Sequence, residues 1–196
     1  MMVEEQSKDL FASNFIYKFK IDKDICDGLI KYHKNNTEYK FIGSTYDGVD
    51  KNIKDSTDVM FFYDSHHPII KKYFAELNKG CTEYLKKYGL TGLHKANRYT
   101  LIQHYKPGGG YKKFHYERGS YGTTDDCVAT RSLVYMTYLN DVKIGGETEW
   151  YYQKLKVKPK KGLSLIWPTD FTHTHRGIVA PKEDKWIATG WFKFVL

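Results

Sequence analysis

Two short segments of this chain carry side chains that could bind a metal ion. One is the H-Y-E sequence at 115–117, and the other is T-H-T-H at 172–175. Residues i and i+2 of a β-strand point to the same face, so His115 and Glu117 could converge on one ion. One further histidine from a distant strand would complete two imidazoles and one carboxylate on one side of a metal. That arrangement leaves three positions open and suits non-haem Fe(II) working with O₂.

The second segment offers two candidates for the further histidine, His173 and His175. If this segment is a strand, both side chains face the same way, so strand alternation cannot choose between them. Without other context, each segment also fits an ordinary polar strand face or a polar rim.

Two helices are predicted in the first half of the chain. Asp22 stands in an N-cap position before 24–34, where apolar residues recur with helical spacing. A longer helix is predicted over 68–88, which has a proline in its first turn, apolar residues at steps of three and four, and Gly89 as a stop signal. Gly80 lies inside this pattern and could weaken or split the helix.

After residue 97 the pattern changes to short β-type runs separated by turn residues. In chain order the runs are RYTLIQHY, the segment around FHYE, SLVYMTYL, ETEWYY, LKVKP, LSLIW and KWIATGWFKFVL. These elements predict a mainly β fold with flanking helices, as in an all-β barrel or jelly roll with helices packed outside. Since the chain has no repeat and no linker, we predict one domain over 1–196. In it, about 1–97 is helical support and about 98–196 is the β core.

The composition argues against several classes of protein. No stretch approaches the roughly 18 apolar residues of a membrane span, and 16% aromatic residues argue against disorder. The formal net charge is +8, yet only four of the 31 basic residues are Arg, so nucleic acid is a secondary expectation. Three distant cysteines and a polar, acidic N-terminal segment predict a cytoplasmic location without disulfides or a signal peptide.

Four longer segments occur in order between about residues 98 and 194. They are YKPGGGYKKFHYE, YMTYLNDVKIGGETEW, KPKKGLSLIW and HRGIVAPKEDKW. Together they resemble the Fe(II)/2-oxoglutarate-dependent dioxygenases of the prolyl 4-hydroxylase type, in which a tyrosine, a Gly-bearing turn and a second aromatic lead into H-x-D. The resemblance covers half of the chain and implies a double-stranded β-helix (jelly-roll) barrel supported by N-terminal α-helices.

By position, the resemblance implies that His115, Glu117 and His175 are the iron ligands. His175 is preferred to His173 because R-G follows it and a lysine lies ten positions on. His173 would then lie behind the ligands or be exposed at the rim. The family usually has Asp where this chain has Glu117. Glutamate is one methylene longer but still supplies a negative oxygen, so Fe(II) binding is expected and halogenase chemistry is not.

The resemblance also implies residues for the co-substrate 2-oxoglutarate. Lys185 would pair with its far carboxylate, Tyr105 would donate to the same carboxylate from the opposite wall, and Thr148 would line the pocket. There is one residue more than usual between Tyr105 and the first histidine ligand, so Tyr111 is the alternative. Arg176 is a rival of Lys185, but its strand position should point it away from the metal face.

The implied activity is hydroxylation of an unactivated C–H bond with O₂ and 2-oxoglutarate, releasing succinate and CO₂, with ascorbate as reductant. Proline in a peptide or protein is the first expectation for the substrate, and no membrane partner is expected. A free amino acid or a nucleobase are the alternative substrates, and a non-catalytic cupin-like or virion binding barrel is the alternative function.

Segments 43–57 and 118–127 would be either flexible lids or plain surface loops. Tyrosines that could stack on proline rings or on bases are Tyr116, Tyr121, Tyr151 and Tyr152.

Overall fold

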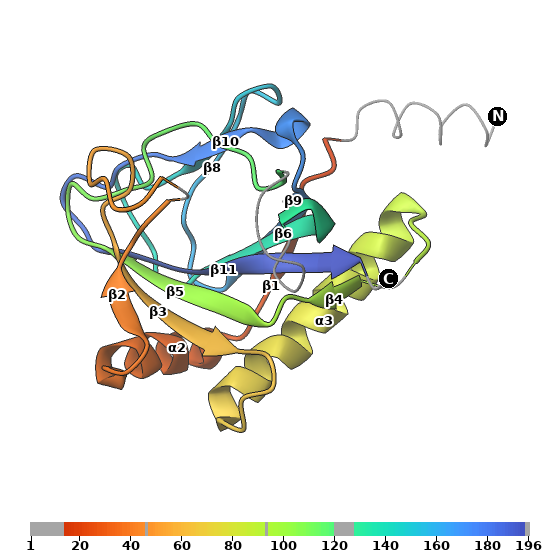
Figure 1. Ribbon diagram of the computed structural model, residues 1–196, viewed down its shortest axis with the longest axis horizontal. Helices are drawn as coiled ribbons and strands as arrows, with labels where there is room; N and C mark the ends of the chain where they lie inside the picture. Colours follow the sequence, from red (N-terminus) through yellow and green to blue (C-terminus); the bar gives the residue numbers. More distant parts are fainter. Residues whose placement is uncertain (1–13, 46, 93, 120–127, 195–196) are drawn as a thin grey trace.

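The computed structural model describes residues 14–45, 47–92, 94–119 and 128–194, and its elements are drawn in Figure 1. The helices are α2 (Lys23–Asn35) and α3 (Pro68–Tyr88), with short 3₁₀ helices η1 (Val128–Thr130) and η2 (Phe171–His173). The strands are β1 (Tyr17–Lys20), β2 (Lys40–Ile42), β3 (Thr57–Phe62), β4 (His94–Ala96), β5 (Tyr99–Tyr105), β6 (Arg131–Tyr138), β7 (Thr148–Trp150), β8 (Leu155–Val157), β9 (Leu163–Pro168), β10 (His175–Gly177) and β11 (Lys185–Phe194).

The strands form a large and a small antiparallel sheet. Within the described residues the major sheet has eight strands in the order β1-β9-β6-β11-β5-β3-β2, with β4 paired to β11. The minor sheet has three, in the order β10-β7-β8. The helices lie on one side of the major sheet and the minor sheet lies on the other (Figure 1). The mainly β prediction is therefore confirmed, and the two sheets are consistent with a jelly roll.

Both helices have the ends that the sequence predicts. The Asp22 side chain accepts a hydrogen bond from the Asp24 amide at the start of α2. Gly89 ends α3 with φ 63°, a left-handed conformation that costs glycine little. Gly80 does not interrupt α3, which runs unbroken from residue 68 to 88. The apolar faces of both helices share one core cluster with the major sheet.

The first half of the chain contributes more than helices, which the sequence analysis did not predict. β1, β2 and β3 all join the major sheet, and β3 pairs with β5 along its whole length. β1 has only four residues, and in β3 the short apolar run 59–62 directly follows the fully buried Asp58. Short length and a buried charge therefore hide these strands from a search for hydrophobic alternation.

The alternation along β6 assigns each side chain to one of two cores. Leu133 and Tyr135 pack with the helices, whereas Val134 and Met136 pack in the cluster that includes the minor sheet. Because both faces of this strand are buried, its sequence is almost continuously apolar. The second cluster lines the space in which the candidate site lies.

Among the described residues, no helix combines the length and the apolar character that crossing a bilayer requires.

We predict that Gly190→Ala destabilises the fold. Gly190 lies on β11 directly opposite Tyr135 on β6, and a methyl group there would lie 2.5 Å from the Tyr135 hydroxyl oxygen and 2.7 Å from its ring carbon Cζ. Tyr135 is fully buried and its hydroxyl shares a 2.6 Å hydrogen bond with Thr100, so the ring has nowhere to move. Overpacking of this kind costs about 1–3 kcal/mol. Equilibrium unfolding in urea measures it.

A double-mutant cycle with Tyr135→Phe provides the control. Removing the hydroxyl deletes the closest atom, so Gly190→Ala should cost less in the Tyr135→Phe protein than in the wild type. Strand propensity alone would instead make the alanine stabilising by about 0.5–1 kcal/mol in both backgrounds. That result would contradict the close approach described here.

Candidate metal centre

His115 and His175 are held together by their own backbones. His115 lies in the segment after β5, and His175 is the first residue of β10. The His115 amide donates to the His175 carbonyl at 2.9 Å, and the His175 amide donates back to the His115 carbonyl at 2.9 Å. The segment around His115 is thus an isolated bridge and not the regular strand that the sequence predicted. The bridge still brings the two imidazoles to a centroid separation of 4.5 Å.

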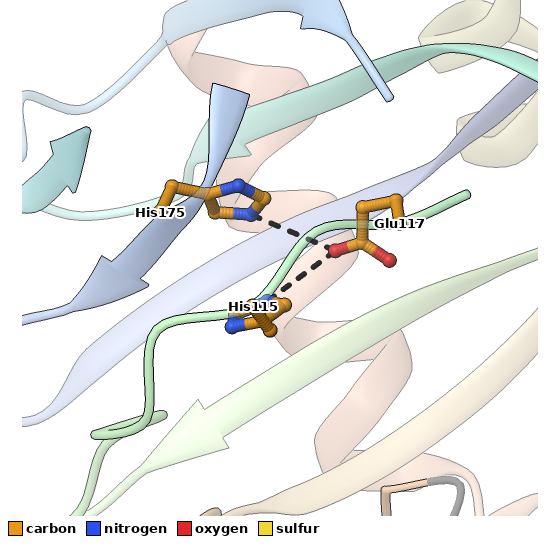
Figure 2. A group of neighbouring side chains, drawn as sticks. All are labelled: His115, Glu117 and His175. Carbon is orange, nitrogen blue, oxygen red and sulfur yellow. Dashed lines mark ion pairs between the residues drawn. The ribbon is translucent and has the colours of Figure 1, made fainter. Parts of the chain in front are cut away.

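Glu117 completes the group, as Figure 2 shows. Its amide donates to the Thr169 carbonyl at 3.0 Å, which fixes the backbone two residues after His115. Its Oε1 lies 3.4 Å from Nε2 of His115 and 3.6 Å from Nε2 of His175. One ligand atom from each residue lies within 4.8 Å of the others, which is close enough for a single ion to bind all three.

The hydrogen bonds on the far sides of the imidazoles determine which nitrogen carries a proton. Nδ1 of His115 lies 2.9 Å from the Lys113 carbonyl, and Nδ1 of His175 lies 2.9 Å from the His173 carbonyl. A carbonyl only accepts, so each Nδ1 bears the hydrogen, and each ring in its neutral form presents its Nε2 lone pair to Glu117. This is the tautomer that a metal-binding histidine adopts.

The electrostatics of the group favour a charged carboxylate. Burial would raise the pKa of Glu117, but the hydrogen bonds and the positive charge that the two histidines supply when protonated outweigh it and hold that pKa well below its usual range. Burial lowers the pKa of His175, and the neighbouring His115 lowers it further. An ionised carboxylate beside imidazole lone pairs fits Fe(II) or another divalent ion.

The second oxygen of Glu117 has partners that the sequence analysis missed. Trp191 Nε1 donates to Oε2 at 3.1 Å, and Nη1 of Arg131 lies 3.6 Å from the same oxygen. Arg131 also donates to the Glu117 carbonyl at 3.2 Å, and its guanidinium carbon lies 3.5 Å from the centre of the Trp191 ring. No sequence motif points to these two residues, because they come from β6 and β11.

A cavity of about 570 Å³ opens beside the three candidate ligands, within the usual range for small-molecule sites. Lys185, the first residue of β11, lies in its wall and is only 4% exposed. Among the described residues no carboxylate forms an ion pair with it, and burial lowers the pKa of its ammonium group to about 8. An unpaired buried ammonium is costly, so this wall suits an anionic ligand.

Tyr105 lies beside Lys185 in the major sheet, and Thr148 lines the same cavity as Lys185. Tyr105 on β5 is the register partner of Lys185 on β11. The Lys185 ammonium nitrogen lies 5.7 Å from the centre of the Tyr105 ring. The Tyr105 hydroxyl donates to Gln103 at 2.7 Å, so in this structure it does not offer its proton to the cavity. Thr148, on the minor sheet, lines the cavity and accepts a 2.7 Å hydrogen bond from Tyr138.

His173 and Arg176, the alternatives to His175 and Lys185, form hydrogen bonds to other residues. His173 belongs to the 3₁₀ helix η2 and His175 to β10, so the T-H-T-H segment is not one continuous strand. Its Nδ1 lies 3.0 Å from the Thr172 hydroxyl and its Nε2 lies 3.0 Å from the Asn14 carbonyl, away from the other candidate ligands. Arg176 also borders the cavity, but its guanidinium donates to Glu149 at 2.7 Å, so its charge is already paired.

Tyr111 and the segment before β3 form another part of the cavity wall. The Tyr111 ring is stacked on His115 with a centroid separation of 3.7 Å. The described part of segment 43–57 is tied to this region because the Asp55 amide donates to the Gly110 carbonyl and the Lys112 amide donates to the Ile53 carbonyl. These bonds make it a wall of the cavity. Most of the second predicted lid, from 120 to 127, lies outside the described residues.

A buried ion pair fixes that wall. Lys54 Nζ lies 2.7 Å from Asp58, and both side chains are at most 5% exposed. Asp58 also accepts hydrogen bonds from Ser56 and Gln103, so its charge is compensated.

Of the tyrosines considered for stacking, Tyr116 lines the cavity at 51% exposure. Tyr151 and Tyr152 are exposed outside the cavity, and Tyr121 lies outside the described residues.

Comparison with solved structures identifies the fold. A viral collagen prolyl hydroxylase from Paramecium Bursaria Chlorella virus-1 superposes with a TM-score of 0.70 at 23% identity, over 93% of this chain and 98% of that one. A prolyl hydroxylase from Trichoplax adhaerens, in complex with a hypoxia inducible factor peptide fragment, has a TM-score of 0.73 at 14% identity, over 99% and 94%. A Pseudomonas putida prolyl-4-hydroxylase has a TM-score of 0.70 at 16% identity, over 96% and 97%.

Sequence comparison agrees with the structural result. The chain is 26% identical over 112 residues to prolyl 4-hydroxylase subunit alpha-2 of Gallus gallus. The match covers 53% of this chain but only 21% of that protein, so the chain corresponds to about a fifth of this relative. Residues 100–193 match the 2OG-Fe(II) oxygenase superfamily. Through these residues, just under half of its length, the chain is similar to the 2OG-Fe(II) oxygenase superfamily, and its fold is prolyl hydroxylase-like.

Proposed function

We propose that this protein is an Fe(II)- and 2-oxoglutarate-dependent dioxygenase that hydroxylates an unactivated C–H bond. One observation carries the proposal. Two Nε2 lone pairs and a carboxylate oxygen face one another beside a cavity whose wall holds an unpaired, buried lysine. The first group suits Fe(II), and the lysine suits the distal carboxylate of 2-oxoglutarate.

Each residue has a stated part in the proposal. His115, Glu117 and His175 bind the ion on one side, and Fe(II) supplies the activation of O₂. Lys185 neutralises the distal carboxylate, and Thr148 lines the pocket beside it. Tyr105 lies beside Lys185, and donates to that carboxylate only if its hydroxyl leaves Gln103. Ascorbate is the expected reductant, and succinate and CO₂ are the expected co-products.

Proline in a peptide or protein is the proposed substrate. The chicken relative is a prolyl 4-hydroxylase subunit, and the Trichoplax structure holds a peptide fragment. In this chain, the exposed Tyr116 and the rings of Tyr99 and Trp191 line the same cavity as the candidate ligands. Aromatic surfaces of this kind pack well against a proline ring.

We predict that turnover of 2-oxoglutarate requires both bridged histidines. His115→Ala and His175→Ala should each abolish succinate formation, since each removes one of the three candidate ligands. Succinate is measured with purified protein, Fe(II), ascorbate and air. His173→Ala is the matched control and should retain most of the activity, because its ring bonds to Thr172 and Asn14. Equal loss from His173→Ala in a folded protein would overturn the ligand assignment.

We predict that 2-oxoglutarate binding weakens above about pH 8. The pKa of Lys185 is lowered by burial to about 8, so the ammonium is charged below this pH and becomes neutral above it. Both carboxylates of the ligand stay ionised in this range. Affinity should be nearly constant between about pH 6 and 7.5 and then fall, by up to about tenfold per pH unit. Calorimetry with the Mn(II)-loaded protein without oxygen measures this dependence.

Two controls test whether Lys185 is the source of this pH dependence. Lys185→Met should reduce 2-oxoglutarate affinity by roughly 10- to 100-fold, as expected for losing a hydrogen bond to a charged group, and should remove the pH dependence while leaving metal binding intact. 2-Oxopentanoate, which lacks the distal carboxylate, should bind without this dependence in both proteins. An unchanged affinity in Lys185→Met would contradict the proposed role.

We predict a product 16 Da heavier on proline when proline-rich peptides are incubated with the protein, Fe(II), 2-oxoglutarate and air. Tandem mass spectrometry locates the added oxygen, and His115→Ala protein provides the blank. The same search in free amino acids and nucleic acid tests the other substrates. Oxygen added only to an amino acid or to a base would refute the peptide assignment while preserving the oxygenase.

A further inference from the structure

The carboxylate of Glu117 is held at both of its oxygens. Oε1 faces the two imidazoles, at 3.4 and 3.6 Å from their Nε2 atoms. Oε2 accepts the indole hydrogen bond of Trp191 at 3.1 Å and lies 3.6 Å from Arg131. The two oxygens therefore have different surroundings, with the two imidazole Nε2 atoms at Oε1 and the indole and guanidinium groups at Oε2.

The donors are themselves fixed in place. Trp191 is 9% exposed and lies on the long strand β11, whose neighbours are β5 and β6. The Arg131 side chain is 13% exposed and lies against the indole, 3.5 Å from its centre. Arg131 also donates to the backbone carbonyl of Glu117. The major sheet thus holds the side chain and the backbone of Glu117 through the same pair of residues.

Glutamate needs such restraint because it has one more rotatable bond than aspartate. A free carboxylate on this longer side chain could turn either oxygen toward an ion, or both, and binding would have to order it. With Oε2 engaged by an N–H, only Oε1 faces the imidazoles. The restraint therefore orients one oxygen, Oε1, before the ion binds, which lowers the entropic cost of binding.

We propose that Trp191 and Arg131 are positioning residues that hold Glu117 so that it offers one oxygen, Oε1, to the metal. This inference rests on the proposed metal site and extends it to two residues that do not touch the ion. One-oxygen binding by Glu117 also keeps the remaining positions on the ion free for a chelating co-substrate and O₂.

Titration with Co(II), followed by its visible absorption, tests the inference without requiring turnover. Trp191→Phe keeps an aromatic ring but removes the N–H, so Oε2 loses its donor. Loss of such a supporting hydrogen bond typically weakens metal binding by 10- to 100-fold, and we expect about tenfold here. Trp186→Phe is the matched control, since it removes an indole from the same strand on the helix side and should leave Co(II) affinity unchanged.

Glu117→Asp separates positioning from general packing. Aspartate is one methylene shorter, so its carboxylate draws back from the indole. Trp191→Phe should then cost less than twofold in Co(II) affinity in the Glu117→Asp protein, against about tenfold in the wild type. Arg131→Lys is the second variant. It should weaken Co(II) binding in the wild type, because a lysine cannot lie flat on the indole and bridge to the carboxylate.

The outcomes distinguish the two proposals. Failure of the wild-type protein to bind Co(II) at its histidines would refute the proposed metal site itself. Tight binding by the wild type with equal affinity in Trp191→Phe would refute only the positioning role. An equal cost of Trp191→Phe in the wild-type and Glu117→Asp backgrounds would also refute it, because a merely structural tryptophan gives additive effects.

Discussion

The site depends on holding three ligand atoms, two imidazole nitrogens and one carboxylate oxygen, close together. Backbone carbonyls accept the Nδ1 hydrogens of His115 and His175, so each ring, when neutral, points its Nε2 lone pair at the carboxylate of Glu117. Such an arrangement is repulsive unless a cation sits in its centre. The reciprocal backbone hydrogen bonds between the two histidines hold it in place. A divalent ion would turn this repulsion into attraction. The three residues therefore suit a metal-binding role better than a purely structural one.

The rest of the fold can be understood as support for that group. The minor sheet contributes His175 and Thr148, whose strands β10 and β7 are paired. The major sheet contributes Lys185 and Trp191 from one strand, β11. Both sheets are packed over a shared apolar cluster, and residues of both line the cavity. A buried ammonium with no ion-pair partner among the described residues is costly, so this wall suits an anionic ligand.

Sequence patterns predicted the parts of the fold that depend on local signals. Asp22 and Gly89 marked the helix ends, and the β-type run SLVYMTYL marked the central strand. The failures have physical causes. β3 was missed because its apolar run, residues 59–62, is short and directly follows Asp58, which is buried with Lys54. The T-H-T-H segment is not one strand, because residues 171–173 form a 3₁₀ turn and only His175 lies on β10.

Sequence motifs predicted the candidate ligands of the site. They did not predict the contacts that form only when distant strands pair. The H-x-E spacing and the distal histidine are readable because the resemblance fixes their order. The partners of Oε2 are not, since they lie 14 and 74 residues beyond Glu117 and only strand pairing brings them there. The exchange of Asp for Glu was the one signal that could have prompted a search for them. Tyr105's bond to Gln103 was equally invisible, because it depends on the buried charge of Asp58.

A crystal structure of the protein grown with Mn(II) and 2-oxoglutarate, with anomalous data collected for the metal, tests the central claim most directly. The account predicts one strong anomalous peak within bonding distance of Nε2 of His115, Nε2 of His175 and Oε1 of Glu117. It also predicts the distal carboxylate of 2-oxoglutarate against Lys185. A metal bound elsewhere, or a 2-oxoglutarate whose distal carboxylate lies away from Lys185, would contradict it.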